Sequence, residues 1–231
     1  MEVENFAVPA LVTGLAWDGS RLWLLEGADR RVSTFEPAPG RFEPRFALAE
    51  PARAIAFHAG ELVSLPADGM RILCLDPATG REKSSLGLED RGAFSLVSDG
   101  KELWLLDQDS RRLSAIDPSS GRRREDRVLS DPVRSPAWAG IDLWALLVRR
   151  ERPAKPFRWR GLAPGAGPFP PGPGSEFALV RIDAGTGGIA ERFALPSEPA
   201  ALAFDGRSFW YSCASAEGLE RLEIPRGLRR D

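Results

Sequence analysis

The chain has 231 residues, of which 43% are hydrophobic, enough for one large all-β domain or two smaller domains. Its 31 basic and 33 acidic residues give a net charge of −2, so no overall positive field attracts nucleic acid or an anionic membrane. No apolar run approaches the roughly 20 residues of a membrane-spanning helix. We therefore expect no nucleic acid and no membrane among its partners.

A phrase that reads Gly-Leu-Ala-Trp-Asp-Gly-Ser-Arg-Leu-Trp begins at Gly14, and degraded copies begin at Ala54, Ser95, Ser135 and Ala201. A second phrase follows each copy and reads Asp/Glu-Pro-x-x-Gly where it is clearest. Its acidic residues stand at positions 36, 76, 117, 183 and 223, so the steps are 40, 41, 66 and 40 residues. The chain is therefore a repeat protein with a period near 40 and one long insertion.

Each repeat contains four short apolar runs separated by turn residues, which predicts a four-stranded antiparallel sheet. In the first repeat we expect strands at about 14–18, 21–25, 31–35 and 42–48. The Asp-Gly pair forms a tight hairpin between the first two strands, because glycine adopts the positive φ that such turns require. The second phrase forms the turn before the fourth strand, and its acids are interpreted as turn formers.

Four-stranded sheets at this period are typical of propeller blades. The last repeat stops after three strands, and residues 4–19 parallel residues 191–206, so residues 3–9 are expected to supply the missing strand and close the ring. We therefore predict an all-β fold, a single five-bladed β-propeller over 1–231. The expected blades are about 14–48, 54–88, 95–129, 135–195 with an insertion at about 149–174, and 201–227 completed by 3–9.

One position of the second strand carries a large apolar side chain in every repeat, and we interpret these side chains as blade-to-blade packing rather than ligand stacking. They are Trp23, Val63, Trp104, Trp144 and Trp210. The two cysteines, Cys74 and Cys213, fall in the second and fifth repeats, which are not neighbours in a ring. We therefore expect no disulfide between them.

The insertion of the fourth repeat replaces a short loop between its second and third strands. Its first half is basic, and its second half, 161–174, is almost wholly Gly, Pro and Ala. Prolines every few residues exclude a helix or a central strand, so we expect an extended loop, of a length that is usually functional or disordered. The basic residues are Arg149, Arg150, Arg152, Lys155, Arg158 and Arg160.

In propellers, the loops between blades and the loops between second and third strands emerge around one mouth of the central channel. This geometry puts one equivalent residue of each repeat at the mouth, and the basic loop, with Arg158 and Trp159, over them. The five residues are Thr13, Arg53, Phe94, Arg134 and Ala200. Because converging guanidinium groups bind carboxylate or phosphate, we predict an anion site at the mouth.

Two other interpretations of these arginines stay open. They could be ordinary surface residues paired with acids on neighbouring loops, among them Glu26 and Asp107. Arg158, Trp159 and Arg160 could also stack on nucleotide bases, although six cations in an acidic chain are a weak signal of that kind.

The residues that are missing restrict the chemistry. The single histidine, His58, falls in a hairpin turn on the face opposite the mouth, which excludes a His-rich metal site and places a Ser-His-Asp arrangement on the wrong face. No P-loop or dinucleotide fingerprint occurs, so we expect no metal and no cofactor. Any catalysis would rest on carboxylates, Tyr211, lysine or arginine. Glu26, ending a second strand at the mouth, is the best-placed carboxylate for acid–base work.

The two phrases resemble those of the plant-type glutaminyl cyclase (glutamine cyclotransferase) propellers and, more loosely, of streptogramin-lyase and NHL-type propellers. The resemblance covers essentially the whole chain and concerns mostly blade scaffolding. It implies an aromatic-Thr-Gln-Gly-Leu phrase in the first blade, of which only Gly14 and Leu15 match, with Thr13 in place of glutamine. It also implies a catalytic glutamate at the start of the following blade, where this chain has Arg53.

The missing glutamate favours a non-enzymatic role. We predict a monomeric binding module that holds an anionic small molecule or an acidic peptide at the mouth. One alternative is a glutaminyl-peptide cyclotransferase that releases ammonia from an N-terminal glutamine with Glu26 as proton shuttle, and another is a scaffold that binds partners on its outer surfaces.

The start of the chain, Met1 to Phe6, lacks the basic and apolar regions of a signal peptide, which predicts a cytoplasmic protein. A chain whose export signal had been removed would also begin almost directly with an element that the fold requires. A secreted or periplasmic location therefore stays open.

Overall fold

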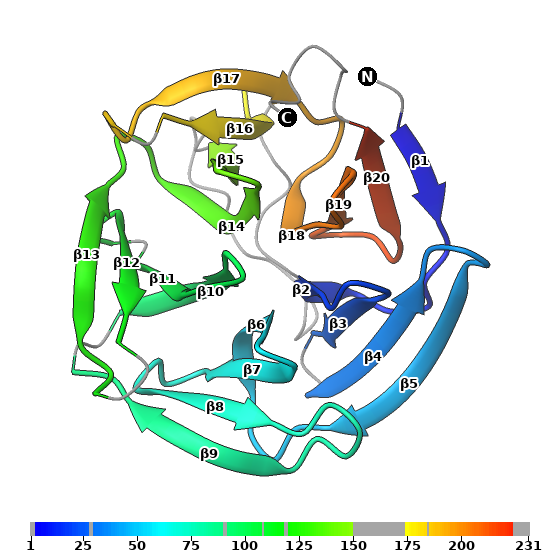
Figure 1. Cartoon of the computed structure of the whole chain (residues 1–231). Coiled ribbons are helices and arrows are strands. Elements are labelled where there is room, and N and C mark those ends of the chain that lie inside the picture. Colours follow the sequence, from blue (N-terminus) through cyan, green and yellow to red (C-terminus); the bar gives the residue numbers. More distant parts are fainter. Residues whose placement is uncertain are drawn as a thin grey trace, which may run out of the picture.

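The structure is a computed structural model that describes residues 3–27, 30–89, 92–107, 109–117, 120–149, 174–183 and 185–223. Within these ranges the chain forms twenty strands and no helix, and the strands build five four-stranded antiparallel sheets. Figure 1 shows the sheets as blades around a central axis, with β2, β6, β10, β14 and β18 innermost. The predicted all-β, five-bladed propeller is therefore confirmed.

Four blades take their strands in chain order from the centre outwards. The first consists of β2 (Val12–Trp17), β3 (Leu22–Glu26), β4 (Arg31–Glu36) and β5 (Arg41–Ala47). The second consists of β6 (Ala52–His58), β7 (Glu61–Pro66), β8 (Arg71–Leu75) and β9 (Glu82–Gly87). The third consists of β10 (Ala93–Ser98), β11 (Leu103–Asp107), β12 (Arg112–Ile116) and β13 (Arg123–Val128). The fourth consists of β14 (Val133–Ala139), β15 (Asp142–Arg149), β16 (Glu176–Ile182) and β17 (Ile189–Ala194).

The fifth blade combines strands from both ends of the chain. It consists of β18 (Pro199–Phe204), β19 (Ser208–Cys213), β20 (Leu219–Glu223) and, outermost, β1 (Val3–Phe6). β1 runs antiparallel to β20, with Val3 opposite Leu222 and Phe6 opposite Leu219, and the two lie side by side in Figure 1. Closure by the N-terminal strand is thus confirmed, although β1 ends at Phe6 and does not reach residue 9. Residues 224–227 of the expected blade lie outside the described residues.

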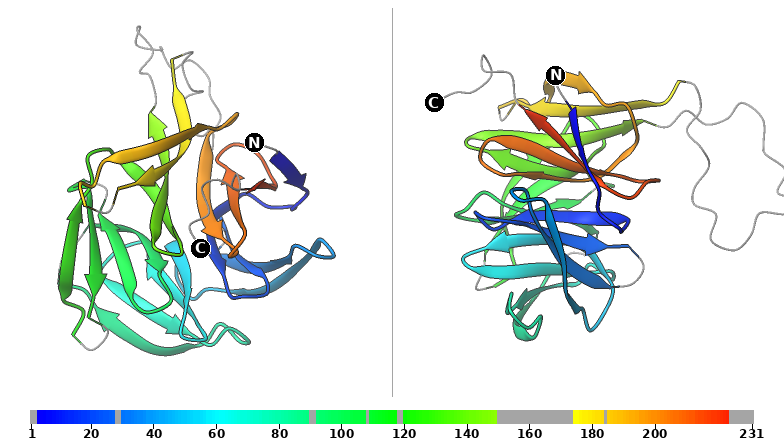
Figure 2. Two further views of the ribbon diagram at one scale, coloured as in Figure 1. Left: turned by 45° about the horizontal axis from the view of Figure 1, so that its top comes forward. Right: turned by 90° about the vertical axis from the view of Figure 1, so that its right-hand side faces the viewer.

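The insertion of the fourth blade begins one residue later than the sequence indicated. Arg149 was expected in the loop, but it ends β15 and pairs with Glu176 of β16. The β15–β16 hairpin therefore continues for one more pair than the sequence suggested, and it projects from the ring in Figure 2. Residues 150–173, which include Arg158 and Trp159, lie outside the described residues.

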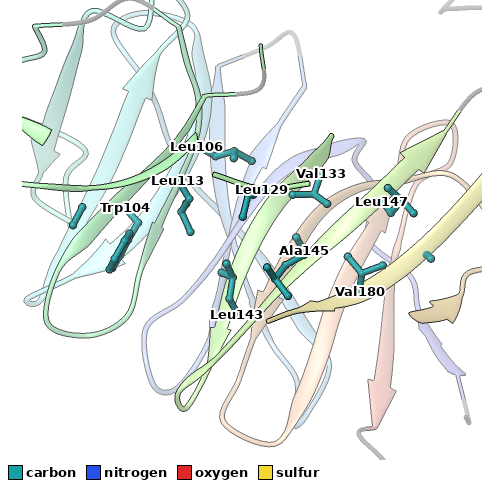
Figure 3. Packing of buried hydrophobic residues seen from close by; sticks show 12 residues of the cluster. Trp104, Leu106, Leu113, Leu129, Val133, Leu143, Ala145, Leu147 and Val180 are labelled. Atoms are coloured by element: carbon teal, nitrogen blue, oxygen red, sulfur yellow. The ribbon is translucent and has the colours of Figure 1, made fainter. Parts of the chain in front are cut away.

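The hydrophobic core lies between the blades. The five residues at the predicted packing position of the second strand are at most 3% exposed, and each belongs to a cluster shared by two neighbouring blades. Figure 3 shows one such cluster, which contains Trp104 of the third blade together with Leu143 and Val180 of the fourth. Burying one such side chain stabilises the fold by about 1.5–3 kcal/mol. The interpretation of these residues as blade packing is confirmed.

The Asp-Gly turns also hold these tryptophans. The Trp23 indole N–H donates to Asp18 Oδ2 at 2.9 Å, and the backbone N–H groups of Ser20 and Arg21 donate to Asp18 Oδ1. The third and fifth blades repeat the indole bond with Asp99 and Asp205 at 3.0 and 2.7 Å. A carboxylate at this turn therefore orders the hairpin and orients the packing tryptophan at the same time.

Candidate functional site

The innermost strands surround a cavity of about 670 Å³ on the axis of the ring. This volume lies within the range of small-molecule sites, which is roughly 300–1,000 Å³. All five strands contribute to the lining, and the lining runs along each of them from the first residues to the last. The cavity is therefore the central channel, with one mouth where these strands begin and the other end where they finish.

A β-bulge stands at the mouth in four of the blades. In the first blade, Val12 pairs with Glu26 and the next pair is Gly14 with Leu25, so Thr13 is left out of the ladder. A bulge breaks the alternation of side chains and can re-aim one of them. The bulged residues of the four blades are Thr13, Arg53, Phe94 and Ala200.

All four bulged residues line the cavity, where the alignment of the repeats puts them. Thr13, Arg53 and Phe94 are exposed, and Phe94 is 36% exposed. The Arg53 guanidinium crosses to the third blade, where it donates to the carbonyl oxygen of Ala93 at 3.3 Å. The structure therefore brings these residues together at one rim, and their binding role stays a prediction.

The fourth blade departs from this pattern. Arg134, expected to be equivalent to the bulged residues, still pairs with Leu146, and the irregularity comes after it, at Ser135 and Pro136. Ser135 adopts φ of 43°, a strained value for a residue with a side chain. Arg134 is accordingly half-buried rather than exposed, but it too lines the cavity.

Glu198 is a site residue that the sequence reasoning missed. It directly precedes β18, is only 8% exposed and lines the cavity. Its carbonyl oxygen accepts the backbone N–H of Ala214 at 2.8 Å, which ties this segment to the residue that follows β19. The repeats contained a signal for it, because the equivalent positions hold Leu11, Pro51, Gly92 and Pro132, so a carboxylate stands alone among residues without polar side chains.

Glu26, the predicted catalytic carboxylate, ends β3 but is not among the described residues that line the cavity. It is 8% exposed, accepts the hydroxyl of Ser33 and forms an ion pair of 3.4 Å with Arg31. Both partners belong to β4, so the carboxylate points along the blade and not into the channel. The sequence placed Glu26 correctly at the end of the second strand, but it could not show the direction in which the side chain points.

One of the basic residues, Arg149 at the edge of the insertion, is paired with acids, as the alternative interpretation of ordinary surface residues expected. The Arg149 guanidinium pairs with Asp131 and also lies 3.5 Å from Glu176. Burial alone would raise the pKa of Asp131, but bonds from the Ser130 hydroxyl and from Arg149 lower it below its ordinary value. Arg149 is thus a paired surface residue.

The far end of the channel has a different character from the mouth. Four innermost strands carry an aromatic residue at the same position there, and β10 carries Ser98 instead. The Ser98 hydroxyl oxygen lies 2.9 Å from His58 Nδ1 and accepts the N–H of Gly100 at 3.0 Å. His58 ends β6, immediately before the Ala59-Gly60 turn, rather than standing inside the turn. The four aromatic residues are Trp17, Phe57, Trp138 and Phe204.

In the part of the chain that the structure describes, no three His, Cys, Asp or Glu side chains form a group able to hold a metal ion. Both cysteines are free thiols. A search of the same residues for a helix long and apolar enough to cross a membrane found none.

No family model matches the chain, and no curated protein is similar to it in sequence. Among solved structures, glutaminyl cyclase from Myxococcus xanthus is similar over 97% of this chain and 96% of its own, with a TM-score of 0.63 and 12% identity. Hydrazine synthase from Kuenenia stuttgartiensis matches 89% of this chain and 56% of its own, with a TM-score of 0.47 and 15% identity. The chain therefore shares with the Myxococcus protein the five-bladed propeller fold that the sequence phrases predicted.

Proposed function

We propose that the protein is a non-catalytic binding module that holds an anionic small molecule, or the carboxylate of an acidic peptide, at the channel mouth. The observation that carries the proposal is that Arg53 and Arg134, from the second and fourth blades, line the same cavity. Guanidinium groups bind carboxylates through paired, charge-assisted hydrogen bonds. Two of them that come from the blades on either side of the third blade can hold an anion between them.

The surroundings of the arginines support this proposal. Arg53 is held near the rim by its bond to Ala93, so little conformational entropy is lost when it binds a ligand. The cavity walls are largely apolar, and hydrogen bonds to charged groups are stronger where water is partly excluded. Among the described lining residues, Glu198 is the one carboxylate. Its negative charge repels a ligand that carries several negative charges.

Thermal unfolding in the presence of acetate, glutamate and citrate tests the proposal. A ligand at 100 times its Kd stabilises the folded state by about 2.7 kcal/mol, which raises the Tm by several degrees. The Arg53→Ala, Arg134→Ala double variant should lose this shift. An Arg41→Ala, Arg207→Ala double variant is the matched control, because it removes the same charge from exposed residues outside the cavity lining. Equal shifts in both variants would rule out the anion site.

A glutaminyl cyclase activity is the second candidate, favoured by the buried Glu198 carboxylate in the cavity and by the fold shared with the Myxococcus enzyme. In this reaction the α-amino group of an N-terminal glutamine attacks the side-chain amide carbon and ammonia leaves. A carboxylate can move the proton from the amine to the leaving nitrogen. Ammonia release from a glutaminyl peptide that is abolished in Glu198→Gln and retained in Glu26→Gln would establish the activity and replace the non-catalytic proposal.

A further inference from the structure

The cavity extends well beyond the proposed anion site. In the first blade its lining is continuous from Thr13 to Trp17, and in the third from Phe94 to Ser98. Four residue steps along a strand cover about 13 Å. A ligand held only at the mouth would leave most of the 670 Å³ cavity unfilled.

The charges of the cavity are confined to the mouth. Among the described lining residues, the charged side chains are Arg53, Arg134 and Glu198, which stand at or before the start of their strands. Two guanidinium groups and one carboxylate leave a single net positive charge, which complements one negative charge on a ligand. A monocarboxylate therefore fits this end better than a dicarboxylate or a phosphate.

The middle of the channel is mainly apolar, and small residues line it beside larger ones such as Leu15, Ile55 and Leu202. No charged side chain lines this part of the channel among the described residues, which disfavours a strongly polar ligand segment. The small residues are Gly14, Ala16, Ala54, Ala56, Ala137 and Ala203.

At the far end, Trp17, Phe57, Trp138 and Phe204 offer half-buried aromatic surface to the cavity. Aromatic side chains bury large apolar areas and bind alkyl and aryl groups. Ser98 interrupts this ring of aromatic residues in the third blade, and its hydroxyl contacts His58 there.

We propose that the ligand is a monocarboxylate with a slim apolar tail, an unbranched alkyl chain or a single aryl group. Its carboxylate lies between Arg53 and Arg134, and its tail runs down the channel to the aromatic residues and Ser98. This inference rests on the proposed anion site and adds the class of ligand and its orientation. It favours a small molecule over an acidic peptide, because no charged or amide side chain lines the middle of the channel among the described residues.

Calorimetric titration with acetate, butyrate, hexanoate and octanoate tests the tail. Burial of each CH₂ group should lower Kd about fourfold, so octanoate, with four more of them, should bind roughly 250-fold more tightly than butyrate. Octanol, with the same tail and no charge, should bind more weakly than octanoate. Arg53→Gln should weaken every carboxylate by roughly tenfold or more and leave the effect of tail length unchanged.

Two variants of Ser98 test where the tail lies. Ser98→Phe puts an aromatic ring at this position, as in the other four blades. It should narrow the far end, reduce the advantage of octanoate over butyrate and leave acetate binding intact. Ser98→Ala loses the contact with His58 without filling space. If it reduces the advantage of octanoate as much as Ser98→Phe does, the effect comes from the lost contact and the inference is overturned. Retained acetate binding also shows that each variant is folded.

Each outcome separates this inference from the proposed function. Acetate binding that depends on Arg53, without a dependence on tail length, would overturn the inference and leave the anion site standing. Octanoate and octanol binding equally, with no effect of Arg53→Gln, would overturn the anion site itself. Tail-length dependence that Ser98→Phe does not change would place the tail outside the channel and also overturn the inference.

Discussion

The hydroxyl oxygen of Ser135 accepts a 2.8 Å hydrogen bond from the backbone N–H of Leu202, joining the innermost strands of the fourth and fifth blades beside the channel. Ser135 reaches this position with a left-handed backbone, φ 43°, at the irregularity that follows Arg134. Leu202 is 2% exposed, so its N–H has little access to water as a replacement partner. The strained serine thus satisfies a buried donor and fixes the segment that carries Arg134.

We predict that Ser135→Ala destabilises the protein by about 1–3 kcal/mol, because the Leu202 N–H loses its partner while the left-handed backbone is retained. Ser135→Gly loses the same bond but relieves about 1 kcal/mol of backbone strain. Its stability should therefore lie between those of the original protein and Ser135→Ala. Urea unfolding of the three proteins measures the order. A glycine variant less stable than the alanine variant would contradict the assigned strain.

Gly187 lies where a Cβ atom would overlap the carbonyl oxygen of Val128, on the outer strand of the preceding blade, and its φ is +69°. Gly187→Ala should therefore cost more than about 2 kcal/mol, from the backbone conformation and from the forced separation of two blades. Gly140 is a matched control, because its φ is +65° and a Cβ there would meet nothing within 4 Å. Gly140→Ala should cost only about 1 kcal/mol. Equal losses of stability in denaturant would show that the blade contact contributes nothing.

The pKa of Asp18 is lowered in the folded protein: burial alone would raise it, but the N–H groups of Arg21 and Ser20 and the indole of Trp23 outweigh burial. A lowered pKa stabilises the fold above the carboxyl's unfolded value near 3.9, and this contribution is lost as the pH falls through the folded value. Asp18→Asn should cost about 1–3 kcal/mol at pH 7, and this difference should shrink towards pH 3. Urea unfolding across this range measures it, and a difference that stays constant with pH would contradict the assignment.

Cys213 has a pKa of about 11, raised from 9.0 by burial and by its bond to Glu220. The thiol should therefore react slowly with iodoacetamide at pH 8 in the folded protein and rapidly in urea. A raised pKa means that stability is full below 9.0 and falls as the pH rises towards 11, because the unfolded thiol ionises first. Cys213→Ser should reduce this loss of stability at alkaline pH. If the free energy of unfolding of the variant falls with pH as steeply as before, other groups such as Tyr211 cause the loss.

The repeat phrases predicted the blade boundaries closely, since a strand and its turn are encoded by neighbouring residues. The strand ends of the first blade differ by at most two residues from those expected, and the parallel between residues 4–19 and 191–206 identified the strand that closes the ring. The tryptophan position was also predictable, because one column of the repeats is apolar in every blade. These features depend on period and composition, which the chain displays directly.

The residues of the candidate site could be predicted from the sequence less completely than the fold. The alignment brought Thr13, Arg53, Phe94 and Arg134 to one channel, but it treated Arg134 as equivalent to the others, whereas the irregularity of β14 falls at Ser135. It selected Glu26, which binds Ser33 and Arg31 within the blade, and passed over Glu198, which lines the cavity. A repeat alignment gives the position of a residue along its strand, but bulges and side-chain partners decide the direction in which its side chain points.

The sequence by itself thus determined the number of blades, the closure of the ring and the residues that pack between blades, because each follows from a pattern repeated along the chain. Only the tertiary structure decided what the channel contains, because its lining joins residues from five blades that have no local relation in the sequence. A charged mouth, an apolar passage and an aromatic far end, interrupted at Ser98, exist only when the ring has closed. The ligand class that we propose follows from that arrangement and not from any single motif.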